Sequence, residues 1–266
     1  MRVTADDSAD YEVRAFSSIA CSSFINSNWL NGQEIITIQN AFLAVVPSQG
    51  LAELYRAFKT SGVIYRSIPC ATPAGVKAQG IWGREISQRV DFTVVKQWLQ
   101  FCSTHHRSHC SKDRSGKKSI LGGFRVINCR AEPPTLEVVS PDQSYVALSY
   151  VWGQGCNSVA WSKVVLDAVE ATKALGFQWL WVDKHCINQS DEVEKAYLIS
   201  KMAWICEAAE VTIIAAAGSD ASHGLPGVGN TPRSIQPRIE IARMKLVSTL
   251  PDPKKLIQES KWSTRG

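Results

Sequence analysis

The chain has 266 residues and a mass of 29.3 kDa, and 45% of its residues are hydrophobic against 20% that are charged. This composition excludes an intrinsically disordered chain, and the length allows one or two domains with a substantial core. A net charge of +5 is mildly basic. Because the positive residues form no long stripe of the kind that tracks a phosphate backbone, we expect no nucleic acid partner.

The N-terminus does not resemble a secretory signal, because its first ten residues, MRVTADDSAD, place acids where a basic patch and an apolar run are needed. The longest apolar runs, Ala41–Val46 and Val211–Ala217, are far shorter than the roughly 20 residues of a membrane-spanning helix. Eight cysteines are scattered through a chain whose size makes disulfide staples unnecessary, which favours reduced thiols. We therefore expect a cytoplasmic protein with no membrane span.

Residues 1–90 carry weak signals and receive no domain assignment. An apolar run from Ile35 to Val46 ends at Pro47, and a short helix is expected over Leu51–Thr60.

Residues 91–144 are interpreted as a helical leader followed by a linker. Apolar residues recur at helical spacing behind Asp91 and predict a helix of about three turns; they are Val94, Trp98, Leu99 and Cys102. A basic loop with serine and glycine over Ser111–Gly123 is a linker by composition. Phe124–Cys129 is predicted as a short strand, and Ala131–Asp142, which contains three prolines, as a loop.

From Tyr145 onward, three apolar runs alternate with two amphipathic patterns. The runs YVALSY (145–150), WLWVD (179–183) and VTIIAAA (211–217) are rich in strand formers. The first pattern predicts a helix that ends at Gly176, with a buried stripe of Val165, Ala168, Val169, Thr172 and Leu175. The second predicts a helix that starts at Ser190 and buries Leu198, Met202, Ile205 and Ala209. This order predicts an α/β fold in which helices flank a parallel sheet.

Four blocks in this order resemble the HET (heterokaryon incompatibility) domain of filamentous fungi: YVALSYVWG (145–153), LGFQWLWVDKHCINQSD (175–191), EKAYLISKMAWICEAAEVTIIAA (194–216) and DASHGLPGV (220–228). The leader WLQFCSTHHRSHC (98–110) is also similar, and the HET domain itself is assigned to residues 145–266. The resemblance implies intracellular signalling in fungal programmed cell death after allorecognition or innate immune triggering. It implies action through protein partners or a homo-oligomer.

The chain departs from the family pattern at two places. Cys206 stands where the family commonly has an aromatic residue, which predicts a modest change in packing. The segment SKWSTRG (260–266) resembles the start of a motif that continues to Gln-Glu, so we expect the domain to be truncated before that glutamate.

HET domains are similar to the flavodoxin-like TIR domains, some of which cleave the nicotinamide–ribose bond of NAD with a glutamate on a helix. The resemblance therefore implies two alternatives: a TIR-like NAD glycohydrolase whose catalytic glutamate is missing from this chain, or an inactive truncated paralogue. It implies no resident cofactor, with NAD as a candidate substrate, and leaves open whether the chain is an enzyme. Fold-level similarity does not settle this question.

Candidate contacts for a nucleotide or a partner gather beyond the carboxyl ends of the predicted strands, where ligands bind in open α/β sheets. They are Ser149, Trp152, Gly153, Asp183, Asn188, Gln189, Asp191 and Glu194. Asp183 and Asn188 either bind a ribose or hold the loop in shape. Trp152 and Gly153 either meet a nucleotide or serve packing and a turn. Glu194 either faces the crevice or is solvated.

Two other clusters are assigned neither a metal-binding nor a catalytic role. Cys102–Cys110 contains the residue types of a zinc site, but five candidate ligands crowded into nine residues, with no second ligand pair elsewhere, disfavour tetrahedral binding. The neighbours His185 and Cys186 point in opposite directions along an extended loop, which disfavours a nucleophilic pair. No catalytic residue and no metal site are assigned, and GLPGV (224–228) is predicted as a plain turn.

Overall fold

A computed structural model describes residues 11–17, 41–47, 64–67, 83–105, 124–153, 160–241, 244–248 and 253–264. The chain divides into two compact units. Unit 1 comprises Met1–Ile86 and Ile235–Leu256, and unit 2 comprises Ser87–Ser234 and Ile257–Gly266. The domain ranges expected from the sequence, 1–90, 91–144 and 145–266, stay a prediction.

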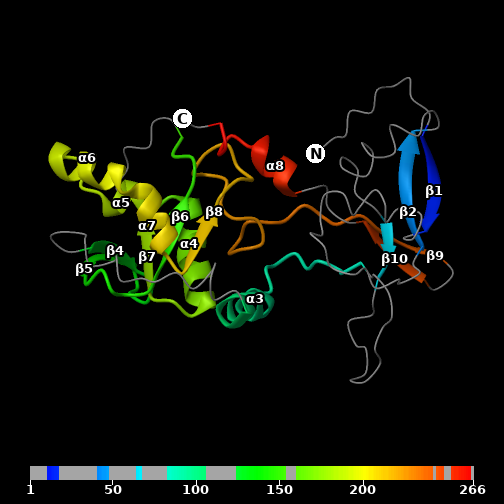
Figure 1. Ribbon diagram of the computed structural model, residues 1–266, viewed down its shortest axis with the longest axis horizontal. Helices are drawn as coiled ribbons and strands as arrows, with labels where there is room; N and C mark the ends of the chain where they lie inside the picture. The colour runs from blue at the N-terminus through cyan, green and yellow to red at the C-terminus, as the bar shows by residue number, and fades with distance from the viewer. Residues whose placement is uncertain are drawn as a thin grey trace. The chain divides into compact units, whose positions relative to one another are not determined.

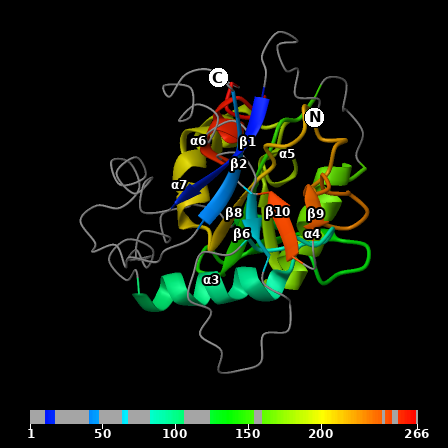
Figure 2. The same cartoon turned by 90° about the vertical axis from the view of Figure 1, so that its right-hand side faces the viewer.

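Unit 1 holds a five-stranded antiparallel sheet in the order β1-β2-β3-β10-β9. Its strands are β1 (Tyr11–Ser17), β2 (Ala41–Pro47), β3 (Ile64–Arg66), β9 (Arg238–Ile241) and β10 (Met244–Ser248). Figure 2 shows the early strands in blue and the late pair in orange. The sheet is thus completed by residues from the far end of the sequence, which explains why residues 1–90 carry weak signals when read alone.

Unit 2 holds a five-stranded mixed sheet in the order β5-β4-β7-β6-β8 (Figure 1). Its strands are β4 (Phe124–Asn128), β5 (Thr135–Val139), β6 (Tyr145–Ser149), β7 (Trp179–Val182) and β8 (Val211–Ile214). Strands β7, β6 and β8 are parallel neighbours, with Val146 opposite both Leu180 and Val211. This confirms the predicted α/β arrangement of the three apolar runs, although β4 runs antiparallel to β5 and β7.

The predicted loop over Ala131–Asp142 is wrong, because β5 occupies its middle. The three prolines, Pro133, Pro134 and Pro141, flank the strand and do not interrupt its ladder with β4. Proline is compatible with the ends of edge strands, and β5 is an edge strand of this sheet. The prolines therefore mark the limits of a short strand.

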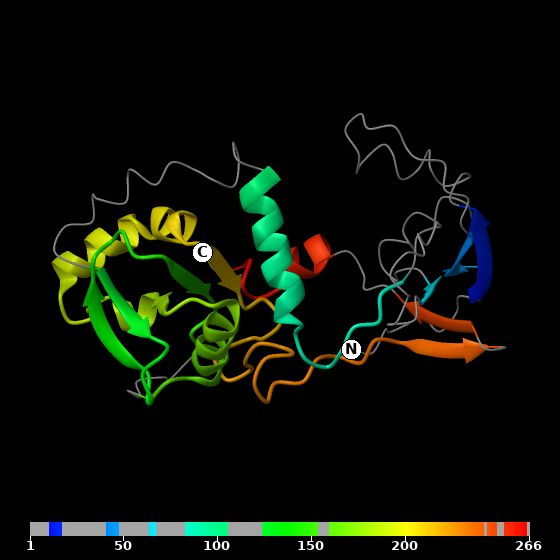
Figure 3. The ribbon, with the colours of Figure 1, turned by 90° about the horizontal axis from the view of Figure 1, so that it is seen from below.

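Helices lie on both faces of the unit 2 sheet. Helix α4 (Lys163–Leu175) buries every residue of its predicted stripe and ends at Gly176, whose φ of 96° is the left-handed C-cap expected from the sequence. Helix α7 (Met202–Ala208) covers the face that carries Tyr145, whose hydroxyl donates to the Ile205 carbonyl at 2.7 Å. Figure 3 shows α4 in light green and α7 in yellow on opposite sides of the strands.

The helix predicted after Ser190 consists of two helices. The first, α6 (Glu192–Ser200), starts after Asp191, whose carboxylate accepts from the backbone amides of Val193 and Glu194, each at 3.0 Å. The chain then turns at Lys201 before α7 begins. The predicted stripe spans this break, because Leu198 on α6 and Ile205 on α7 are both buried.

The leader helix is confirmed as α3 (Phe92–His105), which packs against α4 and buries none of its residues completely. The expected helix over Leu51–Thr60 and the linker Ser111–Gly123 lie outside the described residues. In the part of the chain that the structure describes, no helix combines the length and the apolar character that crossing a bilayer requires.

Candidate functional site

The carboxyl ends of β6, β7 and β8 meet at one edge of the unit 2 sheet. Leu148 lies opposite both Val182 and Ile213, so the next residues, Ser149 and Asp183, come side by side where β6 and β7 end. We call this edge the rim, and define it by residues 149–153, 183–194 and 214–223. The rim contains segments that lie far apart in the sequence, because neighbouring parallel strands are joined by long connections.

Trp152 and Asp183 tie the loop after β6 to the end of β7. The indole nitrogen of Trp152 donates to both carboxylate oxygens of Asp183, at 3.0 and 3.2 Å. The backbone amide of Lys184 donates to the same carboxylate at 2.7 Å. Trp152 is 40% exposed, so it is not a core residue, and its ring remains available to a ligand or partner while its nitrogen holds the loop.

Gly153 brings the loop after β6 against the loop after β8. Its φ of 83° lies in the left-handed region, and a Cβ at this position would come within 2.9 Å of the Asp220 Cβ. The Asp220 carboxylate accepts from the backbone amide and the hydroxyl of Ser222, at 2.8 and 2.6 Å. These hydrogen bonds hold the pKa of Asp220 below its usual value. Both a backbone and a packing requirement therefore specify glycine at position 153.

Ser149, at the centre of the rim, contacts a residue from the end of the described chain. Its hydroxyl accepts a hydrogen bond from the indole nitrogen of Trp262 at 3.0 Å. Trp262 lies in the turns that follow α8 (Pro253–Gln258). This contact could not be predicted from the sequence, because no local pattern connects positions 113 residues apart.

The polar loop after Asp183 is held by its own side chains. It begins with the single turn α5 (Asp183–Cys186). The Gln189 side-chain amide lies 3.3 to 3.4 Å from three backbone carbonyl oxygens, those of Asp183, Lys184 and Ile187. The Asn188 carbonyl oxygen accepts from the Ser190 backbone amide at 3.1 Å, and Asp191 caps α6. These contacts give the loop a defined shape.

Glu194 is tied to strand β4 through Arg125, a residue to which the sequence analysis gave no role. The guanidinium lies 3.7 Å from the Glu194 carboxylate, and each side chain is about a third exposed. The same guanidinium donates to the Cys186 carbonyl at 3.4 Å. Arg125 thus joins the antiparallel part of the sheet to the loop that leads into α6.

His185 and Cys186 do not form a catalytic pair. The His185 ring packs against Trp161, with ring centroids 4.6 Å apart, and burial followed by the charge of Lys184 lowers the pKa of His185. The Cys186 sulfur instead accepts from the Val182 amide at 3.2 Å, and burial raises the pKa of this thiol to about 12. A thiol with this pKa is protonated at neutral pH and is a poor nucleophile.

The turn GLPGV packs on α4 through a buried carboxylate. Asp167 is 6% exposed, and its Oδ2 accepts from the Leu225 amide at 2.8 Å and from the Thr231 hydroxyl at 2.6 Å. Gly224, with φ of 82°, lies so close that a Cβ would come within 2.5 Å of the same oxygen. The predicted structural role of the turn is therefore supported, whereas its anchor, Asp167, was missed.

No metal site is built by the described residues, among which no three His, Cys, Asp or Glu side chains are placed to share an ion. Of the histidine-rich segment, Cys102 and His105 belong to α3, and His106, His109 and Cys110 lie outside the description. Among the described residues, Cys102, Cys129, Cys186 and Cys206 form no disulfide.

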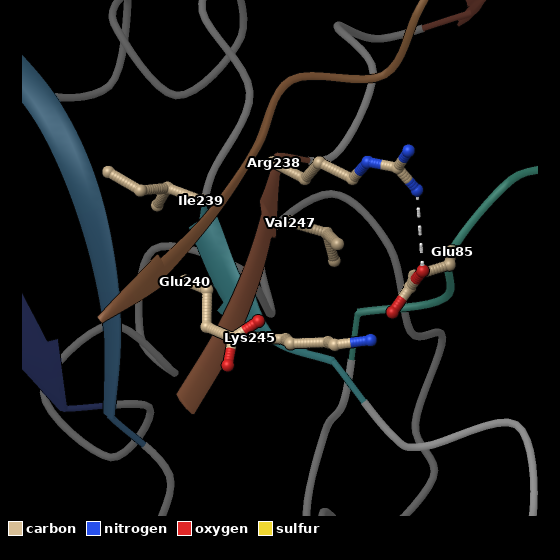
Figure 4. A pocket seen from close by; sticks show the side chains of 6 residues that line it. All are labelled: Glu85, Arg238, Ile239, Glu240, Lys245 and Val247. Carbon is tan, nitrogen blue, oxygen red and sulfur yellow. Dashed lines mark ion pairs between the residues drawn. The ribbon is translucent and has the colours of Figure 1, made fainter. Parts of the chain in front are cut away.

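Unit 1 contains a pocket of about 350 Å³ against β9 and β10 (Figure 4). Its lining is Glu85, Arg238, Ile239, Glu240, Lys245 and Val247. Arg238 and Glu85 form an ion pair at 3.7 Å, and the arginine is 69% exposed, a setting in which such pairs add little stability. Two cations and two carboxylates balance each other, so the lining does not select a ligand by charge.

The comparison with protein families gives one match. The sequence model of the family described as Heterokaryon incompatibility protein (HET) matches residues 145–266, the part of the chain that starts with β6 and contains the whole rim. No curated protein and no solved structure matches the chain. The family match supports a general role in heterokaryon incompatibility.

Proposed function

We propose that residues 145–266, which match the sequence model of the heterokaryon incompatibility (HET) family, signal fungal programmed cell death through protein partners or self-association at the rim. On this proposal the rim is a recognition surface of fixed shape. Its polar side chains hold the loops in place, and its exposed apolar side chains meet the partner. The proposed setting is the cytoplasm.

The observation that carries this proposal is the distribution of exposed apolar side chains along the rim. Each of the three rim segments contains one: Trp152 is 40% exposed, Val193 in the segment after β7 is 82% exposed, and Ile214, the last residue of β8, is 43% exposed. Single exposed apolar residues are common on protein surfaces. Their presence in every rim segment, beside loops that are held by internal hydrogen bonds, supports the assignment of an interaction surface.

A TIR-like NAD glycohydrolase is the second candidate, favoured by the side-by-side placement of Ser149 and Asp183 at the carboxyl edge of parallel strands. Against it, the Asp183 carboxylate already accepts hydrogen bonds from Trp152 and Lys184, and Glu194 is paired with Arg125. Carboxylates that are already bonded within the protein are compatible with a recognition surface, whereas a general acid or base must reach the substrate.

Expression of the full chain in a filamentous fungal host, with cell viability and cellular NAD measured together, tests the proposal. We expect death without loss of NAD. Death accompanied by loss of NAD would instead support NAD cleavage, and would show that the glutamate expected to be missing is not required for it. The purified chain is expected to increase in mass with concentration in light scattering if self-association is the route.

A matched pair of variants ties the outcome to the rim. Val193→Ser removes the most exposed apolar side chain of the rim, and Leu166→Ser makes the same kind of change on α4, where the leucine is 46% exposed. We expect the first variant to weaken killing and association and the second to leave both unchanged. Equal behaviour of Val193→Ser and the unaltered chain would contradict the assignment of the rim as the contact surface.

A further inference from the structure

The segment 257–264, which follows the unit boundary after Leu256, reaches the rim through few side chains. Among its residues only Ser260 and Trp262 are half-buried, and the other six side chains are exposed. The hydrogen bond from Trp262 to Ser149 joins the segment to β6 across 113 positions of sequence. Trp262 is thus the half-buried side chain through which the segment donates a hydrogen bond to the sheet.

The segment keeps its own shape through local hydrogen bonds. The Ser260 amide donates to the Ile257 carbonyl at 3.1 Å, and the Ser263 amide donates to the Ser260 carbonyl at 3.1 Å. The Ser263 hydroxyl also donates to the Ser260 carbonyl at 3.2 Å. Because these bonds lie inside the segment, they can form without the rim, but a turn this short opens more often once the contact with β6 is lost. What the contact with Ser149 adds is therefore the placement of a preformed turn.

The place at which the segment attaches is the centre of the rim. Ser149 lies opposite Ile214 on β8, and it follows Leu148, which pairs with Val182 just before Asp183. On the β8 side, the positive charge of Lys261 acts on Asp220, the residue that packs against Gly153. The segment therefore approaches both the β6 and the β8 parts of the rim.

We propose that segment 257–264 is a fourth component of the rim and that Trp262 is the positioning residue that places it there through its indole N–H. This inference rests on the proposed function, because it assigns the segment to the surface that meets the partner. Trp262 is not thereby a catalytic residue. It acts through Ser149 and through the placement of its neighbours.

Hydrogen exchange followed by mass spectrometry on the full chain tests the placement. Trp262→Phe keeps an aromatic ring but removes the donor, and Trp98→Phe, at an indole that is 63% exposed on α3, is the matched control. Loss of one hydrogen bond predicts roughly two- to tenfold faster exchange of the amides of 257–264 in Trp262→Phe. The control should exchange like the unaltered chain.

Serine variants separate the hydrogen bond from the volume of the ring. Ser149→Thr retains an acceptor hydroxyl, so its amides should exchange at the rate of the unaltered chain. Ser149→Ala removes the acceptor and should behave like Trp262→Phe. The double variant Ser149→Ala with Trp262→Phe should exchange no faster than either single variant, because both remove the same contact. Unchanged exchange in all of these variants would overturn the role of Trp262.

Two further measurements distinguish positioning from general support of the fold. We expect the urea midpoint of Trp262→Phe to equal that of the unaltered chain, since the segment buries little, while killing in the fungal host and self-association fall. A midpoint that drops in step with faster exchange, or full killing despite faster exchange, would refute the proposal. If the unaltered chain neither kills nor associates, the proposed function fails, and the exchange data still decide whether Trp262 places the segment.

Discussion

Replacing Asp167 with alanine should strongly destabilise unit 2. The Asp167 carboxylate is buried on α4 and accepts from the Leu225 amide and the Thr231 hydroxyl, which belong to the segment that follows β8. Alanine leaves both donors without this acceptor in a place that is closed to water. The substitution thus detaches residues 224–231 from the helix on which they pack.

The expected loss follows from these two donors. A buried donor that loses its partner costs about 1 to 3 kcal/mol, and the Thr231 hydroxyl can rotate toward another acceptor, so the sum is about 3 kcal/mol. Asp167→Asn should cost only about 1 kcal/mol, because both donors point at one oxygen, Oδ2, which an amide oxygen can replace without the charge. Thr231→Val should lie between the two.

Urea unfolding followed by tryptophan fluorescence measures these losses, because the core residue Trp181 is 1% exposed and reports the packing of unit 2. With a slope of about 2 kcal/mol per molar urea, Asp167→Ala should lower the midpoint by about 1.5 M. Asp142→Ala, at an exposed turn, is the control and should change the free energy of unfolding by less than about 0.5 kcal/mol. Equal midpoints for Asp167→Ala and this control would refute the reasoning.

Three further predictions use unfolding as the main measurement. Gly176→Ala should cost about 1 kcal/mol from backbone strain alone, since nothing lies within 4 Å of the added Cβ, whereas Gly224→Ala should cost far more because its Cβ would clash with the Thr231 hydroxyl; equal losses would contradict this. Tyr145→Phe should cost about 1 to 2 kcal/mol by leaving the buried Ile205 carbonyl without its donor, and a midpoint equal to that of the unaltered chain would contradict it. Burial raises the pKa of both Cys129 and Cys186 to about 12 from 9.0, so the unfolded chain loses these protons first and stability should fall as pH rises from 9 toward 12. A thiol reagent at pH 8 should therefore modify neither cysteine until urea unfolds the chain, and a slope of stability against pH that is unaffected by Cys186→Ala would contradict the cause.

Features that depend on neighbouring residues were predicted well. The stripe of α4 and its C-cap at Gly176 follow from helical spacing and from the freedom of glycine at positive φ, and both agree with the structure. The three parallel strands follow from apolar runs of strand length, and the first two runs place a polar residue, Ser149 or Asp183, where the strand ends. In such cases the physical cause lies within a few positions of the residue concerned.

The errors arise where a local pattern has two interpretations. Three prolines predict a loop over Ala131–Asp142. Proline prevents pairing only at a position whose own amide must donate, and the residues between the prolines pair with β4. One amphipathic stripe was taken as one helix after Ser190, but the stripe continues through the turn at Lys201 because both helices pack on the same core. The sequence pattern indicates which residues are buried, but more than one backbone conformation can bury the same residues.

Two residues that form a hydrogen bond but lie far apart in the sequence leave no local pattern. Several contacts of the candidate site are of this kind, so they could not be predicted from the sequence. Asp167 pairs with Thr231 across 64 positions, Trp152 with Asp183 across 31, and Trp262 with Ser149 across 113. Read along α4, Asp167 is a charged residue beside an apolar stripe, and the usual inference is that it faces water. In the fold it is buried, because residues 224–231 cover a second side of the helix, so the buried face of α4 extends to Val164 and Ala171. A substitution scan planned from the sequence would place Asp167→Ala among the harmless surface changes, and the unfolding experiment separates these two interpretations directly.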